Sequence, residues 1–147
     1  MTIYLGADHG GFELKQLIKE WLKAQDSDVI DCGALEFDGN DDYPDYAFTV
    51  AEKVVETKDS IGILFCRSGG GMTIAANKIK GIRAVDIFDL TSAIHAKSHN
   101  NANIISLGAN WMDPGETKLI IENFLKTPFQ AEERHQRRLK KIAEKEL

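Results

Sequence analysis

The stretch Ser60–Lys78, SIGILFCRSGGGMTIAANK, constrains the fold of this chain more than any other. It opens with an apolar run that is typical of a buried strand, and Cys66 stands where that run stops. Three glycines and a helical pattern follow. Strand, glycine turn and helix in this order present free backbone N–H groups at a helix N-terminus, which suits an anion. The stretch therefore predicts a thiol, a hydroxyl and several amide donors close together, although a cysteine ending a buried strand also fits an inert hydrophobic residue.

Short apolar runs alternate with amphipathic segments along the rest of the chain. Strands are expected at 2–7, 29–32, 61–65, 82–88 and 104–107. Helices are expected around 14–22, from 44 to about 55, and at 72–78, 91–101, 113–126 and 131–147. Right-handed crossovers between such strands give a parallel sheet with helices on both faces. We therefore expect one three-layer α/β/α domain over residues 1–147, with a C-terminal helical extension.

Composition excludes several classes of protein. The chain has 147 residues, of which 43% are hydrophobic, and this is enough for one domain with a core. Its net charge of -5 argues against a general nucleic-acid surface. Cys32 and Cys66 form no spacing motif, which favours a reduced compartment. Without a signal-peptide pattern or a membrane-length apolar run, the expected location is the cytoplasm, with no membrane partner.

Candidate functional residues follow the strands, because ligands of such sheets bind beyond the carboxyl ends of the strands. These candidates carry chemistry that can hold or react with an anion: Asp8, His9, Cys66, Arg67, Ser68, His95, His99, Asn100, Arg134 and Arg138. Each also has a structural interpretation. Asp8 fits a cap of the first helix, and the arginine-rich last helix fits a solvated face. His95 and His99 have helical spacing for zinc, but no further ligands cluster with them.

Six motifs occur here in one order: GADHGGFELK, DYPDYA, C-x-S-G-x-G with IAANK, GIRAV, HNNAN and RHxxR. Between Gly6 and Arg138 the chain therefore resembles the type B ribose-5-phosphate isomerases, a family that includes the galactose-6-phosphate isomerase subunits. The resemblance implies a flavodoxin-like five-stranded parallel sheet and a homodimer, often paired into tetramers. It also implies aldose–ketose isomerisation of a phosphorylated sugar without metal or organic cofactor.

The resemblance assigns catalytic roles residue by residue. The proton-abstracting cysteine falls on Cys66, since the position of an alternative glutamate is Met72 here. The ring-opening histidine falls on His99, which would come with Asn100 from the neighbouring subunit. Ser68 matches the hydroxyl that handles the sugar O1 and O2 protons, and Asp8 matches the contact to the ring oxygen.

The resemblance also assigns binding roles. The amides of the glycine loop, which are those of Gly69, Gly70, Gly71 and Met72, match the enediolate-binding segment. The phosphate ligands match His9, Arg134 and Arg138, and Tyr43 lies in the loop that borders the sugar. The last helix, about 131–147, would pack on the partner subunit.

Two positions depart from the family pattern. The residue after the cysteine is usually glycine and is Arg67 here, and a family arginine after the fifth strand is replaced by Asn110. We expect Arg67 to take over the lost phosphate contact, the alternative being drift with Arg67 in solvent.

Ribose 5-phosphate is the leading substrate, with tetrose and hexose phosphates as alternatives. A non-catalytic phosphosugar sensor and an inactive subunit of a hetero-oligomer remain as other functions.

Overall fold

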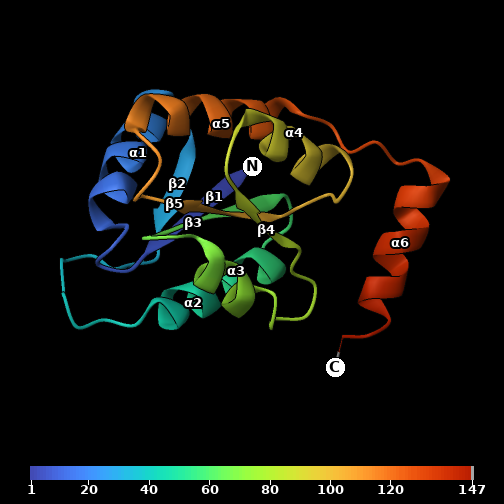
Figure 1. Ribbon diagram of the computed structural model, residues 1–147, viewed down its shortest axis with the longest axis horizontal. Coiled ribbons are helices and arrows are strands. Elements are labelled where there is room, and N and C mark those ends of the chain that lie inside the picture. The colour runs from blue at the N-terminus through green and yellow to red at the C-terminus, as the bar shows by residue number, and fades with distance from the viewer. Residues whose placement is uncertain (147) are drawn as a thin grey trace.

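The fold is a single parallel sheet between two layers of helices (Figure 1). It is seen in a computed structural model, which describes residues 1–146. The sheet has five strands in the order β2-β1-β3-β5-β4. Their bounds are β1 Thr2–Ala7, β2 Asp28–Asp31, β3 Ser60–Cys66, β4 Ala84–Ile87 and β5 Ile104–Gly108. The expected α/β class and the parallel five-stranded sheet are confirmed.

Six helices accompany the sheet. Their bounds are α1 Phe12–Ala24, α2 Tyr43–Glu56, α3 Gly70–Ala76, α4 Leu90–Ser98, α5 Pro114–Lys126 and α6 Glu133–Ala143. Figure 1 shows α1, α4 and α5 on one face of the sheet and α2 and α3 on the other. The predicted start of α5 is confirmed, because the Asp113 side chain accepts a hydrogen bond from the Glu116 N–H at 2.8 Å and Pro114 follows the cap.

The strand order differs in one place from the flavodoxin order 2-1-3-4-5. Here β5 lies between β3 and β4, so the chain reverses direction after β4. With right-handed crossovers, this reversal moves α4 to the face that carries α1 and α5. The burial of the two strands matches this order. Every residue of β5 is buried, as in an interior strand, whereas β4 carries half-buried residues and lies at the edge of the sheet.

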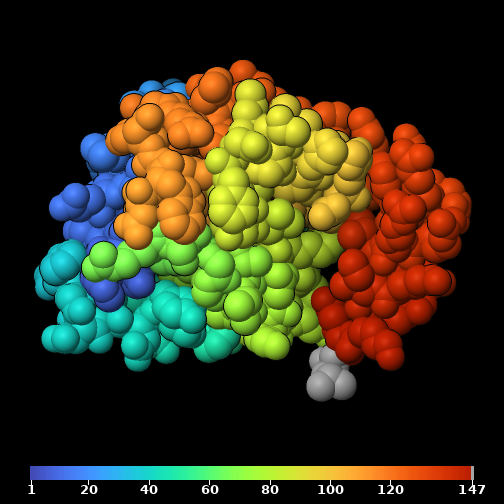
Figure 2. Space-filling model, viewed as in Figure 1, coloured from blue at the N-terminus to red at the C-terminus, as the bar shows by residue number. Residues whose placement is uncertain are grey.

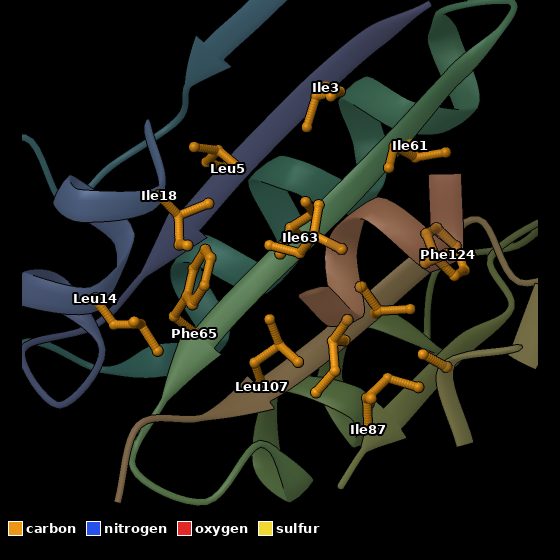
Figure 3. Close-up of a cluster of buried hydrophobic side chains, with 14 of the residues drawn as sticks. Ile3, Leu5, Leu14, Ile18, Ile61, Ile63, Phe65, Ile87, Leu107 and Phe124 are labelled. Carbon is orange, nitrogen blue, oxygen red and sulfur yellow. The ribbon is translucent and has the colours of Figure 1, made fainter. Parts of the chain in front are cut away.

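Two apolar clusters hold the layers together, one on each face of the sheet. Figure 3 shows the larger cluster, in which Leu14 and Ile18 of α1 and Phe124 of α5 pack on side chains of the strands. The smaller cluster joins α2 and α3 to the other face and includes Leu64 and Met72. Burial of each large apolar side chain contributes about 1.5–3 kcal/mol, so these clusters dominate the favourable side of folding.

Some details differ from the expectations. Leu17 is 53% exposed and Val55 is 45% exposed, so the apolar faces of α1 and α2 are narrower than the spacing predicted. Helix α6 covers 133–143 instead of 131–147, and Leu147 lies outside the described residues. Among the described residues, no helix has both the length and the apolar character to cross a bilayer.

A buried charged group lies between α1 and the carboxyl end of β2. The Lys15 side chain is fully buried, and its Nζ donates to Asp31 Oδ1 at 2.8 Å and to the Ala34 carbonyl oxygen. Lys19 Nζ contacts the other Asp31 oxygen at 3.0 Å. Burial acts to raise the pKa of Asp31, but the bonds from Lys15, Gly33 and Lys19 outweigh it and hold that pKa below its usual value. This group anchors the start of the loop that leads to α2.

We predict that Lys15→Met lowers the free energy of unfolding by about 3 kcal/mol, because removing one partner of a buried ion pair leaves the other charge poorly compensated. Lys19 still contacts Asp31, which keeps the loss near the lower end of the usual range. Urea unfolding measures the effect. The control is Lys53→Met, because Lys53 is exposed and lies 3.6 Å from Glu56; its effect should stay below about 1 kcal/mol. Equal losses in both variants would contradict the prediction.

An unpartnered carboxyl lies at the opposite edge of the sheet. Asp86 of β4 has a buried Oδ1 without a hydrogen-bond partner, and burial raises the pKa of this residue. Ser106 is its neighbour in the β4–β5 register, and the Ser106 Oγ is also buried without a partner. Leaving such an atom unpaired typically costs about 1–3 kcal/mol. The ionised form of Asp86 therefore destabilises the fold.

We predict a pH-dependent gain in stability for Asp86→Asn. Because the native pKa of Asp86 is raised from 3.8, the wild type loses stability as pH rises from that value to the native pKa, and the loss is constant above it. The variant should melt about 2–4 °C above the wild type at pH 8, which corresponds to roughly 1 kcal/mol, and match it near pH 4. Melting curves at both pH values test this, with Glu20→Gln on exposed α1 surface as the control. A pH-independent difference would refute it.

Candidate active site

The candidate site lies where the carboxyl ends of β1 and β3 meet. These strands pair in parallel with Ala7 opposite Phe65, so Asp8 and Cys66, which come next in the two segments, are brought to one edge. The connections that leave β1 and β3 run to opposite faces of the sheet at this point, which is where open α/β sheets bind ligands. A pocket of about 320 Å³ opens there, lined by Asp8, His9, Tyr43, Cys66, Arg67, Ser68 and Gly71.

The Cys66 thiol is held by the glycine loop. Cys66 is only 5% exposed, yet it is a free thiol that lines the pocket, and its Sγ accepts a hydrogen bond from the Gly69 N–H at 3.0 Å. Gly69 has φ of 85°, a conformation that strains any residue with a side chain. A Cβ at Gly69 would also collide with the Asp86 carboxylate. The loop therefore fits tightly between the sulfur and the edge strand.

Tyr43 forms the wall opposite the glycine loop. A Cβ added at Gly71 would lie 2.5 Å from the Tyr43 ring, so the first turn of α3 and the first residue of α2 touch. Tyr43 lines the same pocket as Cys66. Close approach here is allowed only because Gly71 has no side chain.

Asp8 holds the turn before α1 but does not cap this helix, whose N-cap is Gly11 and has no side-chain cap bond. Its Oδ1 accepts hydrogen bonds from the Gly10 N–H at 2.9 Å and the Gly11 N–H at 3.2 Å, just before α1 begins. Burial raises the pKa of Asp8, and the bonds from the two glycine amides and the neighbouring His9 oppose that rise. The carboxyl is thus anchored by the turn and also lines the pocket.

His9 is fixed by an aspartate to which the sequence pattern gave no role. Asp41 Oδ1 accepts hydrogen bonds from the His9 backbone N–H at 3.0 Å and from its ring Nδ1 at 2.7 Å. Burial acts to raise the pKa of Asp41, but the two bonds from His9 outweigh it and lower that pKa. The edge of the Phe37 ring contacts His9 as well, with centroids 6.4 Å apart. The loop before α2 therefore orients this imidazole.

Two groups of side chains contain the residue types that bind metal ions. Asp8, His9 and Asp41 bring ligand atoms within 4.8 Å of one another. However, His9 Nδ1 is bonded to Asp41, and Asp8 Oδ1 is bonded to two amides, so these donors are committed within the protein. His95, His99 and His135 stack with ring centroids 4.5 and 4.7 Å apart. The Nδ1 of His135 is directed to the Gln130 carbonyl oxygen at 2.8 Å, so this ring is used for structure.

Arg67 lies between two pockets. It lines the Cys66 pocket and also an adjoining pocket of about 370 Å³, together with His9 and Asn110. Its aliphatic stem lies over Gly10, where an added Cβ would be 2.5 Å from Arg67 Cγ. The two positions that depart from the family pattern, Arg67 and Asn110, are therefore neighbours in space.

The remaining expected site residues lie elsewhere in the chain. His99, Asn100 and Arg138 line a different pocket, of about 570 Å³, between α6 and the end of the sheet that carries β4. Figure 2 shows α6 as a separate ridge at the right of the molecule, away from the glycine loop. Arg134 is exposed on α6, where it pairs with Glu132 at 3.2 Å and lies beside His135.

His99 has a distinctive electrostatic setting. Its burial lowers its pKa, and the neighbouring His95, His135 and Arg134 lower it further because a second positive charge nearby is unfavourable. The imidazole is therefore neutral at neutral pH and can accept a proton.

Within one chain, the structure brings together one half of the expected site and separates it from the other. Asp8, His9, Tyr43, Cys66, Arg67, Ser68 and the glycine loop form the first half. His99, Asn100, Arg134 and Arg138 belong to the region around α6. Sequence reasoning missed Asp41 and Asp86. Asp41 is one of several acids in a polar segment, and nothing local separates it from Asp38 or Asp42.

Comparison with known proteins finds related chains over almost the whole sequence. Residues 3–142 match the Ribose/Galactose Isomerase family. Ribose-5-phosphate isomerase B of Mycobacterium tuberculosis is 43% identical over 146 residues, which are 99% of this chain and 90% of that protein.

Solved structures give the same result. A ribose 5-phosphate isomerase of Thermotoga maritima superposes with a TM-score of 0.93 at 40% identity, covering 97% of each chain. Ribose-5-phosphate isomerase B of Mycoplasma genitalium, solved with bound ribulose 5-phosphate, has a TM-score of 0.93 at 42% identity and covers 97% of this chain and 94% of its own. By sequence and by fold, this chain belongs to the ribose/galactose isomerase family.

Proposed function

We propose that the protein interconverts ribose 5-phosphate and ribulose 5-phosphate through an enediolate, with Cys66 as the base and without a metal or organic cofactor. The observation that carries this proposal is the free Cys66 thiol in the wall of a pocket that also holds Asp8, Ser68 and Tyr43. The relative from Mycoplasma genitalium, which contains ribulose 5-phosphate, supports this choice of substrate.

The chemistry uses two functions of the glycine loop. The Cys66 thiolate takes the proton from C2 of the open-chain sugar and returns it to C1, while Ser68 handles the protons on O1 and O2. Negative charge develops on the enediolate oxygens, and the amides in the first turn of α3 can stabilise it. The Gly69 N–H is bonded to the sulfur, which leaves Gly70, Gly71 and Met72 as the donors for the intermediate. Each such donor is typically worth about 3–4 kcal/mol.

Ring opening requires a second group, for which His99 is the candidate. Its neutral imidazole can accept the O1 hydroxyl proton of the cyclic sugar as the bond between C1 and the ring oxygen breaks, with Asn100 beside it. The ring oxygen takes up a proton at the position that Asp8 can contact. Since His99 and Cys66 line different pockets of one chain, a complete site needs a second copy of the chain. A twofold dimer would carry α6 and His99 of each subunit to the Cys66 pocket of the other. The oligomer is thus a homodimer or a tetramer made of such dimers.

The phosphate would be held at a distance from the reacting carbons. His9 and Arg67 approach it from the Cys66 side, and Arg134 and Arg138 approach it from α6 of the partner subunit. The arginines at 134 and 138 are four residues apart and share one helix face. Arg67 supplies a positive charge beside Asn110, where the family usually has an arginine. Binding energy from this remote contact fixes C2 against the thiolate.

The activity is tested by incubating purified protein with ribose 5-phosphate in D₂O and following ketose formation and deuterium uptake by NMR. Erythrose 4-phosphate and hexose 6-phosphates run in parallel decide among sugar lengths. Ribose 5-phosphate should be converted fastest. Binding of these sugars with neither ketose formation nor deuterium uptake would instead indicate a phosphosugar sensor.

We predict that Cys66→Ser lowers kcat by about 100–10,000-fold, which is the usual contribution of a positioned base. Cys32→Ser is the matched control, since Cys32 is the other free thiol and lies outside the pocket; its kcat should remain within about twofold of wild type. If both serine variants keep full activity, another residue is the base.

The shared site can be tested with the same variants. Equal amounts of inactive Cys66→Ser and His99→Ala chains, exchanged through the dissociated state, should regain about a quarter of wild-type activity. Half of the random dimers are then mixed, and each mixed dimer has one intact site. No recovery, with mixed dimers present by native mass spectrometry, would place Cys66 and His99 of one chain in the same site.

We further predict that Arg67→Ala lowers kcat/KM for phosphosugars by about 10–100-fold, because a charge-assisted bond to phosphate is worth about 1.5–3 kcal/mol. The control is Arg137→Ala on the exposed face of α6, where Arg137 pairs with Glu133. A change of less than twofold in the Arg67 variant would remove this residue from the phosphate site.

A further inference from the structure

The loop between β2 and α2 buries one acidic side chain and leaves its acidic neighbours exposed. The Asp41 side chain is only 6% exposed, whereas Asp38 and Asp42 in the same loop are exposed. Both hydrogen bonds accepted by its Oδ1 come from His9, one from the backbone and one from the ring. Tyr46 neighbours the same carboxylate, and burial together with Asp41 raises the pKa of the Tyr46 hydroxyl to about 12. The His9 imidazole is the ring that Asp41 Oδ1 binds, so this carboxylate can act on it.

The geometry determines the state of the His9 ring. An ionised carboxylate can only accept hydrogen bonds, so His9 Nδ1 must carry a proton when it contacts Asp41 at 2.7 Å. The other ring nitrogen, Nε2, is then the atom through which His9 can contact a ligand. The Phe37 ring packs edge-on against His9 and restricts its rotation further. His9 also lines both pockets that Arg67 separates.

Charged groups surround the His9 ring. Asp8 precedes His9 in the chain, Asp41 contacts it from the loop, and Glu13 of α1 lines one of the same pockets. Arg67 lines both pockets together with His9. Because Asp41 occupies Nδ1, Nε2 is the ring nitrogen that can contact an anion held beside Arg67.

We propose that Asp41 is a positioning residue that holds His9 as an Nδ1–H donor to itself and directs the His9 Nε2 to the phosphate of the substrate. This assignment rests on the proposed function for the identity of the ligand. Asp41 does not touch the sugar. It determines which nitrogen His9 offers and in which direction.

The test compares Asp41→Asn with Asp42→Asn. Asp42 is the adjacent residue, is exposed, and makes no side-chain capping bond to α2. Asp41→Asn should raise KM for ribose 5-phosphate about tenfold, equivalent to about 1.4 kcal/mol, and change kcat less than about twofold, because a remote contact acts on ground state and transition state alike. Asp42→Asn should match the wild type. Equal KM values in the two variants would overturn the proposal.

A second measurement does not depend on catalysis or on the variant folding. Long-range ¹H–¹⁵N NMR of the full-length wild type reports which ring nitrogen of His9 carries a proton, and His9→Gln assigns the signal. We expect a protonated Nδ1 and a perturbation of Nε2 when inorganic phosphate is added. A bare Nδ1 in the wild type would overturn the proposal even if the isomerase activity is present. If the protein fails to isomerise any aldose phosphate but retains this NMR pattern, the substrate assignment fails and the role of Asp41 in anion binding stands.

Discussion

The parallel pairing of β1 with β3 is the constraint on which the rest of the structure depends. This ladder places the ends of the two strands side by side, so a carboxyl that follows one strand and a thiol that ends the other share a pocket. Both strands are buried on both faces by apolar clusters, and a one-residue shift in register would move side chains such as Leu5 and Ile63 from the cluster they fill to the opposite face. The same packing that stabilises the sheet therefore sets the separation between Asp8 and Cys66.

Buried acidic groups divide into those with partners and those without. Asp31 is neutralised by Lys15 and Lys19, and Asp41 is bonded to His9, so the pKa of each acid is lowered. Burial raises the pKa of both Asp8 and Asp86. The paired acids hold the loop between β2 and α2, which forms one wall of the pocket. Asp8 still has two amide donors, whereas Asp86 Oδ1 has no partner among the described residues, so Asp86 is the acid whose ionisation destabilises the fold.

Helix α6 exposes side chains that the rest of the chain does not cover. This helix has a single buried residue, His135, and its apolar Ile142 is 57% exposed. The region it borders contains the neutral His99 and two exposed arginines, while the thiol lies in another pocket. In the proposed dimer, a second copy of the chain would cover the apolar positions and bring the acid, the base and the phosphate-binding groups together.

Local sequence was sufficient for much of the architecture. Strands, helices and the capped start of α5 follow from apolar periodicity and from residues such as Asp113 and Pro114, whose preferences act within a few residues. The strand–glycine–helix segment also located the thiol and the amides correctly, since Cys66 and Gly69 are only three residues apart. Family motifs supplied the proposed roles of residues distant in sequence.

Tertiary structure alone decided the features that join distant segments. No local pattern distinguishes Asp41 from Asp38 or Asp42, because its contact with His9 spans 32 residues and depends on how the loop folds back. The order of β4 and β5 also depends on packing. The fully buried strand β5 lies inside the sheet, next to β3, and β4 lies at the edge. Sequence by itself determined the elements and the reactive groups, whereas packing determined which of those groups meet, because a contact between distant residues is set by the energy of the whole core and not by the preferences of either residue.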